Sequence, residues 1–311
     1  MQNLHRVYIR RSKHTSGLNN MDFFTVCLNP TLQKTLLFPS VKPDAVNRTK
    51  AHQLDASGKG INVTRVLTQL GKKSIHLTQL GGDFRPLFLS LCERDGLSVE
   101  WVESCSQIRF CCTLLTSDNH HTTELVEESA TVCPETEERL LNKCDALLNE
   151  VDFKWLIVSG TKAAGFSDRV IPSIVCKAKE KGLKIMLDIK GNDLIESLNY
   201  EPDIVKPNYF EFVSTFGDKS VRDTVMDMVK TYRCRIVLTD GSCKIIAADG
   251  VNFFNIEFNP IKAINATGCG DSFTAGLASA LEDGADFNAA IAEGCRCGGL
   301  NAGLIKPGVI R

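Results

Sequence analysis

The chain has 311 residues, of which 43% are hydrophobic and 23% charged, with a formal net charge of −1. This length allows one large α/β domain or two smaller ones, and the composition is ordinary for a globular protein. The near-zero charge gives no argument for a nucleic-acid partner. No apolar run reaches the roughly 18–20 residues that span a bilayer, so we also expect no membrane partner.

Thirteen cysteines are scattered along the chain, many of them inside apolar stretches. The number is odd, and neither a Cys-x-x-Cys pair nor a zinc-like Cys/His spacing occurs. Most of the cysteines are therefore predicted to be small buried thiols in a reducing compartment, which favours a cytoplasmic location.

Residues 1–20 are basic and polar and lack the apolar centre of a signal peptide. They are interpreted as a disordered or non-native extension, and Met21 as a possible natural start. A single domain is predicted over 21–311.

Short apolar runs predict strands, and helical periodicity predicts the helices between them. In the first half, strands are predicted at 23–28, 36–38, 47–54, 74–80, 98–102, 107–115 and 122–126, with helices at about 61–70 and 85–94. In the second half, strands are predicted at 155–158, 183–187, 204–206, 235–238, 244–247 and 251–254, with helices for about 15 residues from 134, at 168–181, in stretches up to 232, and as a final pair after Gly268.

This alternation predicts an α/β fold with a mostly parallel sheet and helices on both faces. The strand-rich parts, about 35–56 and 107–127, fit that sheet badly and are predicted to form a small β lid. In such sheets a site lies at the carboxyl ends of the strands. Polar residues follow several predicted strands there: Asn29, Ser159, Asp188, Asn208, Thr239 and Asp240.

The most informative stretch runs from Asn265 to Leu277, where Gly268, Cys269, Gly270 and Asp271 precede a helical pattern. A tight turn into a helix start presents free backbone N–H groups and suits an anion. Asp271 would lie beside that anion as a proton acceptor. The alternative is an ordinary turn in which Asp271 only caps the helix.

Two further motifs have the same ambiguity. Gly58, Lys59, Gly60 and Asn62 form a glycine turn, with a cation and an amide, that could hold sugar hydroxyls or a phosphate, or could be a structural turn. Asn208-Tyr-Phe-Glu211 places an amide and a carboxylate on one helix turn, where Glu211 could hold the water shell of Mg²⁺, or could simply begin a surface helix.

Together these motifs resemble the ribokinase-like, PfkB family of sugar kinases, from about Phe23 to the C-terminus. Thr267 to Phe273 matches the family's second signature, apart from Cys269 at a usual alanine. The segments Thr25–Pro30, Gly58–Val63 and Val205–Asn208 resemble the branch that contains 1-phosphofructokinases and tagatose-6-phosphate kinases.

The resemblance implies roles for the matching residues. Asp271 would be the base, and the N–H groups of Gly268, Cys269 and Gly270 the anion hole for the transferred phosphoryl group. The sugar would be bound by Gln33, Gly58, Lys59, Gly60, Asn62, Arg109 and Ser159. The nucleotide would be bound by Lys206, Asn208, Thr239, Gly241 and Asn301, with Mg²⁺ held by Glu211 through water. Arg109 would bind the substrate's existing phosphate; the alternative is a solvated lid charge.

Three departures from the family concern the substrate rather than the transfer machinery. Gln33 stands where close relatives carry an acidic residue, and Lys162 adds a cation near the sugar end. The loop 239–244 lacks the usual Gly-x-x-Gly spacing.

The implied activity is phosphorylation of a sugar phosphate by ATP and Mg²⁺, with fructose 1-phosphate as the first choice. Tagatose 6-phosphate, a non-phosphorylated sugar or a nucleoside are alternative substrates, and a non-catalytic sugar-phosphate sensor is a lower-ranked alternative. Exposed lid strands invite pairing with a second copy, so a homodimer through the lid is expected.

Overall fold

A computed structural model describes residues 20–118, 121–218, 220–242, 244–258 and 262–311. The predicted extension lies almost wholly outside these residues, and so do two residues between the strands predicted at 107–115 and 122–126. Within them, no helix is both long and apolar enough to cross a membrane.

The main body is built on a sheet of nine described strands in the order β13-β12-β11-β10-β9-β8-β1-β4-β5. Neighbours from β11 to β5 run parallel, and β12 and β13 are antiparallel additions at one edge. The mostly parallel α/β sheet predicted from the sequence is confirmed. The strands are β1 (Asn20–Leu28), β4 (Ser74–Gly81), β5 (Ser98–Ser104), β8 (Asp152–Lys162), β9 (Lys184–Asp188), β10 (Ile204–Val205), β11 (Arg235–Asp240), β12 (Lys244–Ala248) and β13 (Phe253–Glu257).

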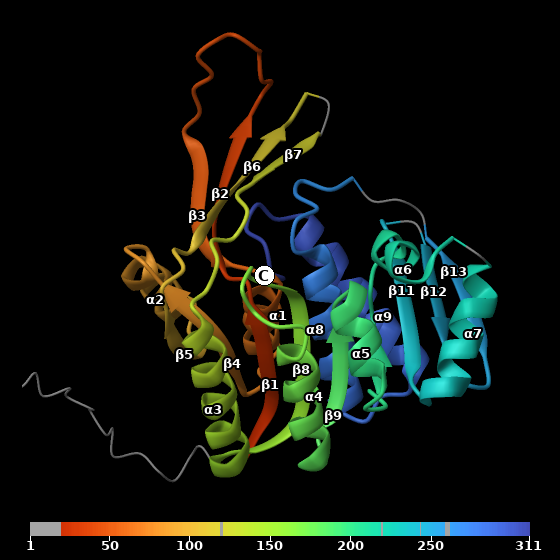
Figure 1. The fold of residues 1–311 in the computed structure, drawn as a ribbon. Coiled ribbons are helices and arrows are strands. Elements are labelled where there is room, and N and C mark those ends of the chain that lie inside the picture. The colour runs from red at the N-terminus through yellow and green to blue at the C-terminus, as the bar shows by residue number, and fades with distance from the viewer. Residues whose placement is uncertain (1–19, 119–120, 219, 243, 259–261) are drawn as a thin grey trace, which may run out of the picture.

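Helices cover both faces of this sheet (Figure 1). One face packs against α3 (Pro134–Glu150), α4 (Val170–Glu180), α5 (Gly191–Leu198), α6 (Tyr209–Phe216) and α7 (Val221–Tyr232). The other packs against α1 (Lys59–Gln69), α8 (Cys269–Glu282) and α9 (Phe287–Ala302). Successive side chains of a strand point to opposite faces, so Trp155 and Ile157 of β8 enter one core while Leu156 and Val158 enter the other. Burial on both faces explains the unbroken apolar runs.

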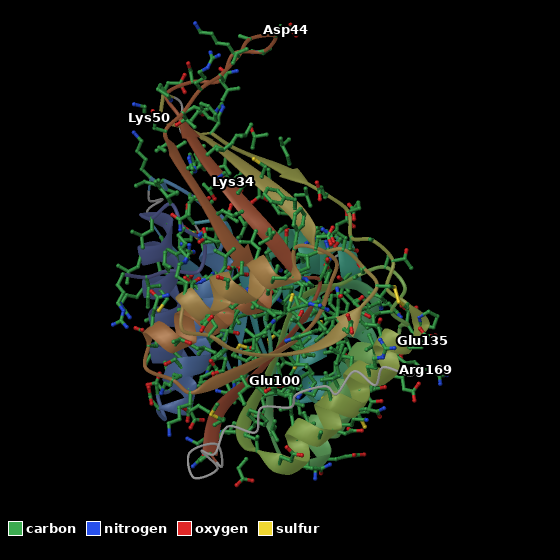
Figure 2. The ribbon with its side chains drawn as sticks, turned by 90° about the vertical axis from the view of Figure 1, so that its left-hand side faces the viewer. Lys34, Asp44, Lys50, Glu100, Glu135 and Arg169 are labelled. Atoms are coloured by element: carbon green, nitrogen blue, oxygen red, sulfur yellow. A yellow bond between two sulfur atoms is a disulfide. The ribbon has the colours of Figure 1, made fainter. Side chains whose placement is uncertain are left out.

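A second, smaller sheet forms the lid, in the order β3-β2-β6-β7. Its strands are β2 (Thr31–Phe38), β3 (Ala51–Ser57), β6 (Arg109–Thr116) and β7 (Thr122–Val126), and α2 (Arg85–Arg94) packs under its base. The β2–β3 hairpin projects far from the body, with Asp44 at its tip (Figure 2).

Two predicted strands of the lid had the wrong bounds, and one helix of the main body was missed. The strand predicted at 36–38 begins at Thr31, because Thr31, Gln33 and Thr35 are buried polar residues that an apolar pattern does not detect. The strand predicted at 47–54 is shifted to Ala51–Ser57. The helix α5 was not predicted, since its eight residues are too few to establish a helical period.

One cysteine pair is an exception to the prediction that most of the cysteines are buried thiols. Cys105 and Cys133 form a disulfide, whereas many of the other described cysteines are buried thiols, as predicted. The bond joins the chain entering the β6–β7 hairpin to the chain leaving it. A sequence separation of 28 carries no signal for such a pair, because only the return of the hairpin brings the two ends together.

Candidate active site

The helices α1 and α8 begin at the carboxyl ends of β1, β8 and β9, with the lid above them (Figure 1). Gly268 caps α8 in the left-handed region, with φ of 84°. A Cβ atom at this position would lie 2.7 Å from the Gly308 nitrogen and 2.9 Å from Asn301 Oδ1. Glycine is therefore required both by the backbone conformation and by the approach of the C-terminal segment.

Asp271 lies in the first turn of α8 and is 7% exposed. Its Oδ2 accepts a hydrogen bond from Asn62 Nδ2 at 2.8 Å. Burial, and after it the nearby Asp188 carboxylate, raises the pKa of Asp271 to about 6, against the opposing effects of Lys59, Asn62 and Lys206. A carboxylate with a pKa close to neutral is suited to accept a proton from an alcohol.

The turn before Asp271 has the local shape that an anion hole needs. The first N–H groups of an α-helix have no acceptor within the helix, and Gly270 occupies the second helical position. The Cys269 N–H, however, donates to the Ala266 carbonyl at 3.2 Å within the turn. Of the three predicted amides, Cys269 is thus the one already engaged inside the protein.

A cluster of charged side chains lies next to this turn. Lys59 Nζ is 2.9 Å from Glu211 Oε1 and 3.4 Å from Asp188 Oδ1. The buried Lys206 Nζ lies 3.6 Å from the same Asp188 oxygen. The ammonium group of Lys59 bridges the turn at the start of α1 to α6 and β9, which places a positive charge close to Asp271.

Asp188 is the centre of this cluster, although the sequence suggested only that it follows a strand. Its Oδ2 accepts hydrogen bonds from Ser159 and Thr274, each at 3.0 Å. Burial acts to raise the pKa of Asp188, but Lys206, Lys59 and these hydroxyls outweigh it and lower the pKa. A carboxylate that stays charged in the core fixes both ammonium groups. The signal that could have found its role is a charged residue directly after a buried strand.

The first glycine turn lies against the end of β1. A Cβ atom on Gly60 would lie 2.6 Å from Cys27 Cβ and 2.8 Å from His76 Cε1, so only glycine permits this packing of α1. Asn62 is buried, and besides Asp271 it contacts Ser57, whose hydroxyl donates to Asn62 Oδ1 at 3.2 Å. The turn thus delivers Asn62 directly to the proposed base.

Asn208 and Glu211 form a capping box at the start of α6, in which each side chain accepts from the other's backbone N–H. The Glu211 carboxylate also contacts Lys59. No group of three metal-ligating side chains occurs among the described residues. Mg²⁺ usually takes one or two carboxylates and keeps several waters and substrate phosphates, so Glu211 fits the predicted water-mediated role.

The other predicted nucleotide residues have mixed surroundings. Thr239 is the residue before the last of β11 and forms a β-bridge with Asn208, and Gly241 follows the strand in a turn with φ of 57°. Asn301 is fully buried, and its amide bonds to Ser272, Lys306 and Gly308. Its contacts are therefore those of a brace between α9, α8 and the C-terminal segment.

The lid places Arg109 and Gln33 on neighbouring strands. Arg109 starts β6 and donates to the Glu127 carbonyl at 3.3 Å, while its buried Nε has no partner among the residues that the structure describes. Gln33 on β2 is buried and donates to Thr113 Oγ1 at 2.7 Å. Arg109 thus keeps donor capacity that the described residues do not use.

Lys162 has a different environment from the one its position suggested. Its Nζ lies 2.5 Å from Asp193 and 2.9 Å from Asp168. Its charge is therefore compensated by two carboxylates within the body.

One contact joins the lid to the glycine turn. The Thr267 hydroxyl donates to Glu124 Oε1 at 2.7 Å, across 143 residues of sequence. Glu124 lies on β7, whose five residues are all exposed. The lid therefore reaches the turn that precedes Asp271.

The fold is similar to those of several solved kinases. The tetrameric inhibited form of phosphofructokinase-2 from Escherichia coli superposes with a TM-score of 0.80 at 21% identity, over 91% of this chain and 94% of that one. A possible 1-phosphofructokinase from Thermotoga maritima gives 0.78 at 20% identity, over 89% and 90%. Ribokinase from Thermotoga maritima gives 0.69 at 15% identity, over 93% and 95%. The predicted ribokinase-like fold is confirmed.

Residues 28–307 match the pfkB family carbohydrate kinases. This match spans most of the chain and includes both glycine turns, the Asn208–Glu211 box and Asp271. The chain belongs to the pfkB family of carbohydrate kinases, which are phosphotransferases with an alcohol group as acceptor.

Proposed function

We propose that this protein phosphorylates a hydroxyl group of a sugar phosphate with ATP and Mg²⁺, and that fructose 1-phosphate is its substrate. The observation that carries the proposal is the placement of Asp271, a buried carboxylate with a pKa near neutrality, in the first turn of α8 beside the Gly268–Gly270 turn. A proton acceptor and a helix N-terminus that favours anions then flank one point in space.

The residues divide the work of phosphoryl transfer, which asks a protein mainly for position and charge stabilisation. Asp271 takes the proton of the attacking hydroxyl. The N–H groups of Gly268 and Gly270 and the Lys59 ammonium stabilise the negative charge of the transferred group. Asn62 holds Asp271, and Asp188 holds Lys59. Mg²⁺ would neutralise the nucleotide phosphates, with Glu211 orienting its water shell.

The surroundings of Arg109 support a substrate that already carries a phosphate. Arg109 is a cation on the lid strand next to that of Gln33, and its buried Nε lacks a partner among the described residues. An arginine fork binds a phosphate with two parallel hydrogen bonds. Gln33 in place of an acidic residue lets an amide, rather than a carboxylate, meet the sugar hydroxyls, and its own amide nitrogen is already bonded to Thr113.

The test is ADP release measured over a panel of fructose 1-phosphate, fructose 6-phosphate, tagatose 6-phosphate, free sugars and nucleosides. We expect the highest kcat/KM for fructose 1-phosphate. Asp271→Ala should lower kcat by about 10²–10⁴. Turnover within a few-fold of wild type would exclude Asp271 as the base. A higher kcat/KM for a free sugar or a nucleoside would show that fructose 1-phosphate is not the substrate. Binding of a sugar phosphate in calorimetry without ADP formation would show that the protein is a sensor and not a kinase.

We also propose that two copies pair through their lids. Leu125 and Val126 of β7 are 55% and 52% exposed, and β7 and β3 each leave one strand edge unpaired within the lid sheet. Exposed apolar edge strands favour pairing with another chain. Light scattering should give the mass of a dimer, and a monomer mass at working concentration would contradict the pairing.

A further inference from the structure

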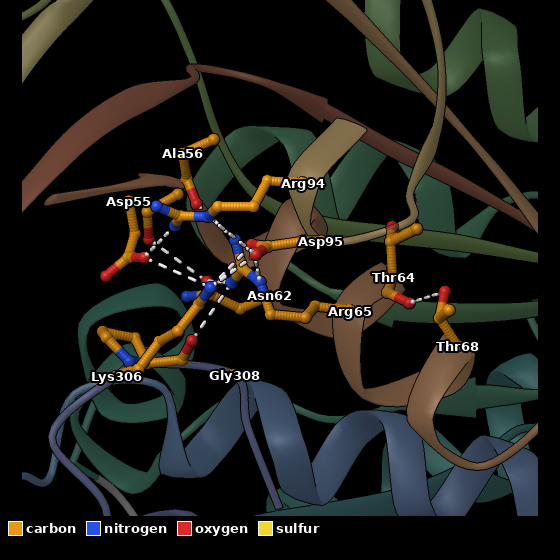
Figure 3. A network of polar contacts seen from close by, with 12 residues as sticks. Asp55, Ala56, Asn62, Thr64, Arg65, Thr68, Arg94, Asp95, Lys306 and Gly308 are labelled. Carbon is orange, nitrogen blue, oxygen red and sulfur yellow. Dashed lines mark hydrogen bonds and ion pairs between the residues drawn. The ribbon is translucent and has the colours of Figure 1, made fainter. Parts of the chain in front are cut away.

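A buried arginine on α1 connects the site to the rest of the molecule (Figure 3). Arg65 is 3% exposed, and its Nε donates to Asp95 Oδ2 at 2.8 Å. Its two terminal nitrogens donate to the carbonyl groups of Ala56 and Pro307. These anchors come from the end of the lid strand β3, from the residue after α2 and from the C-terminal segment. The guanidinium group is thus held from three directions.

The same guanidinium makes one contact toward the site. Its NH1 donates to Asn62 Oδ1 at 2.9 Å, and the Ser57 hydroxyl donates to that oxygen at 3.2 Å. A guanidinium can only donate, so it must face the oxygen of the Asn62 amide and not the nitrogen. The Asn62 nitrogen is thereby left to donate to Asp271, at 2.8 Å. Reversing the amide would break both sets of bonds at once.

We propose that Arg65 is a positioning residue of the phosphoryl-transfer site, which fixes the Asn62 amide in the orientation that donates to Asp271. The charge of Arg65 is compensated by Asp95, and the two carbonyl bonds hold the fork in one plane. This orientation of the Asn62 amide determines the hydrogen bond that Asp271 accepts. The consequence for catalysis rests on the proposed function of Asp271 as the base.

Releasing the amide has a defined electrostatic consequence. A hydrogen bond to the charged form of a carboxyl group lowers its pKa, so loss of the Asn62 bond raises the pKa of Asp271 further. The other groups that act on Asp271 are Lys59 at the start of α1, Asp188 at the end of β9 and Lys206 after β10. The neighbouring thiols are Cys269 in the same turn and Cys27 of β1. An Arg65 substitution replaces none of these groups.

The decisive variant is Arg65→Lys. It keeps a positive charge for Asp95, but one ammonium group cannot reproduce a planar fork that reaches Asp95, two carbonyls and Asn62 together. The readout is the pKa of Asp271, measured by NMR on protein with ¹³C-labelled aspartate carboxyls and assigned with Asp271→Asn. We expect an upward shift of about one pH unit or more, and the acid limb of the kcat profile should move with it.

The matched control is Arg94→Gln. Arg94 belongs to the same network, but it is 53% exposed and pairs with Asp55 at 3.0 Å and Asp95 at 3.6 Å. It faces a cavity of about 590 Å³ rather than Asn62. We expect this variant to keep the wild-type pKa of Asp271.

Arg65→Met serves as the second variant if Arg65→Lys fails to fold. It fills the space of the aliphatic stem but offers no donor to Asn62 Oδ1, and Lys306 still pairs with Asp95 at 2.6 Å, so it should shift the pKa in the same direction. A folded Arg65→Lys protein with reduced stability and an unchanged Asp271 pKa would show a structural role only and overturn the proposal. An unchanged pKa in Arg65→Met, where Arg65→Lys is unfolded, would also overturn it.

The titration involves no turnover, so the two proposals can fail separately. A shifted Asp271 pKa in a protein that phosphorylates nothing in the substrate panel would retain the positioning role and remove the proposed function. A wild-type protein that phosphorylates a sugar phosphate, together with an unshifted Asp271 pKa in the Arg65 variant, would retain the proposed function and remove the positioning role.

Discussion

The carboxyl end of the nine-stranded sheet and the β6–β7 hairpin of the lid both carry charged side chains, in different surroundings. At the sheet, Asp188 and Lys206 have side-chain exposures of 2% and 3% and pair inside the protein. In the hairpin, Glu124 and Glu127 are exposed, and Arg109 Nε has no partner within the described part of the chain. Charges at the sheet are thus organised before a ligand arrives, whereas the lid keeps donors that a ligand could use.

This difference separates two tasks. Stabilisation of a transferring phosphoryl group depends on groups that are already in place, because fixed charges need no rearrangement during the reaction. Recognition of a substrate gains more from groups that are uncommitted until it binds. The comparison predicts that substitutions at the sheet affect folding and kcat, and that substitutions in the hairpin affect KM.

The largest effect on folding is expected for Asp188→Asn. The amide has the shape of the carboxylate but removes the charge that compensates the buried Lys206 ammonium, whereas Lys59 keeps its ion pair with Glu211. Removing one partner of a buried ion pair typically costs about 3–5 kcal/mol, so we expect a loss of about 3 kcal/mol in the free energy of unfolding by urea titration.

The matched control for Asp188→Asn is Glu127→Gln in the hairpin. Glu127 Oε2 accepts from the Phe110 N–H at 2.7 Å, and glutamine keeps an acceptor. We expect a change below about 1 kcal/mol. Equal losses in the two variants would remove the distinction between sheet and lid.

The next effect is expected for Arg109→Ala. Hydrogen bonds to a charged group are worth about 1.5–3 kcal/mol, which corresponds to a rise of roughly 10–100-fold in KM for a sugar phosphate. The kcat at saturation should change little, because Arg109 does not touch the transferring group in this assignment. Lys34→Ala, which removes a different lid cation, is the control and should leave KM unchanged. A wild-type KM in the Arg109 variant would show that Arg109 is a solvated charge on the lid and does not bind the substrate.

The pH dependence gives a further effect, with its sign fixed by Asp271. The raised pKa, about 6, means that the carboxyl group is protonated below pH 6 and cannot accept a proton. We expect kcat to be constant above pH 7 and to fall about tenfold per unit below pH 6. A phosphate monoester also ionises near pH 6, so kcat must be measured at saturation. A limb near pH 4 would show that burial does not raise the pKa of the base.

Much of the active end could be predicted from the sequence because its motifs are local. The turn at Gly268 and the capping box at Asn208 each lie within a few residues, and their backbone geometry follows from glycine, asparagine and glutamate at fixed spacing. The alternation of apolar runs likewise predicted the sheet, since strands buried on both faces contain few polar residues.

What could not be predicted depends on contacts between distant segments. The bonds from Arg65 to Asp95 and Pro307 span 30 and 242 residues, and no spacing rule connects them. The strand β2 was predicted too short because its buried threonines and glutamine bond to the lid rather than to water. The disulfide between Cys105 and Cys133 needed the hairpin to return to its base.

The smallest effect is expected where the two regions meet, at the hydrogen bond from Thr267 to Glu124. This bond is exposed, so its contribution is about 1 kcal/mol or less, and Glu124→Ala should raise KM for the sugar phosphate no more than about fivefold with kcat unchanged. Thr267→Val, which keeps the side-chain shape, should have a similar effect.

The double variant of Glu124→Ala and Thr267→Val shows whether the bond holds the lid closed or the two residues act independently. If the bond holds the lid over the turn, the second substitution adds nothing to the first, because the bond is already lost. Effects that add would mean that lid closure does not use this contact, and that hairpin and turn respond to the substrate separately.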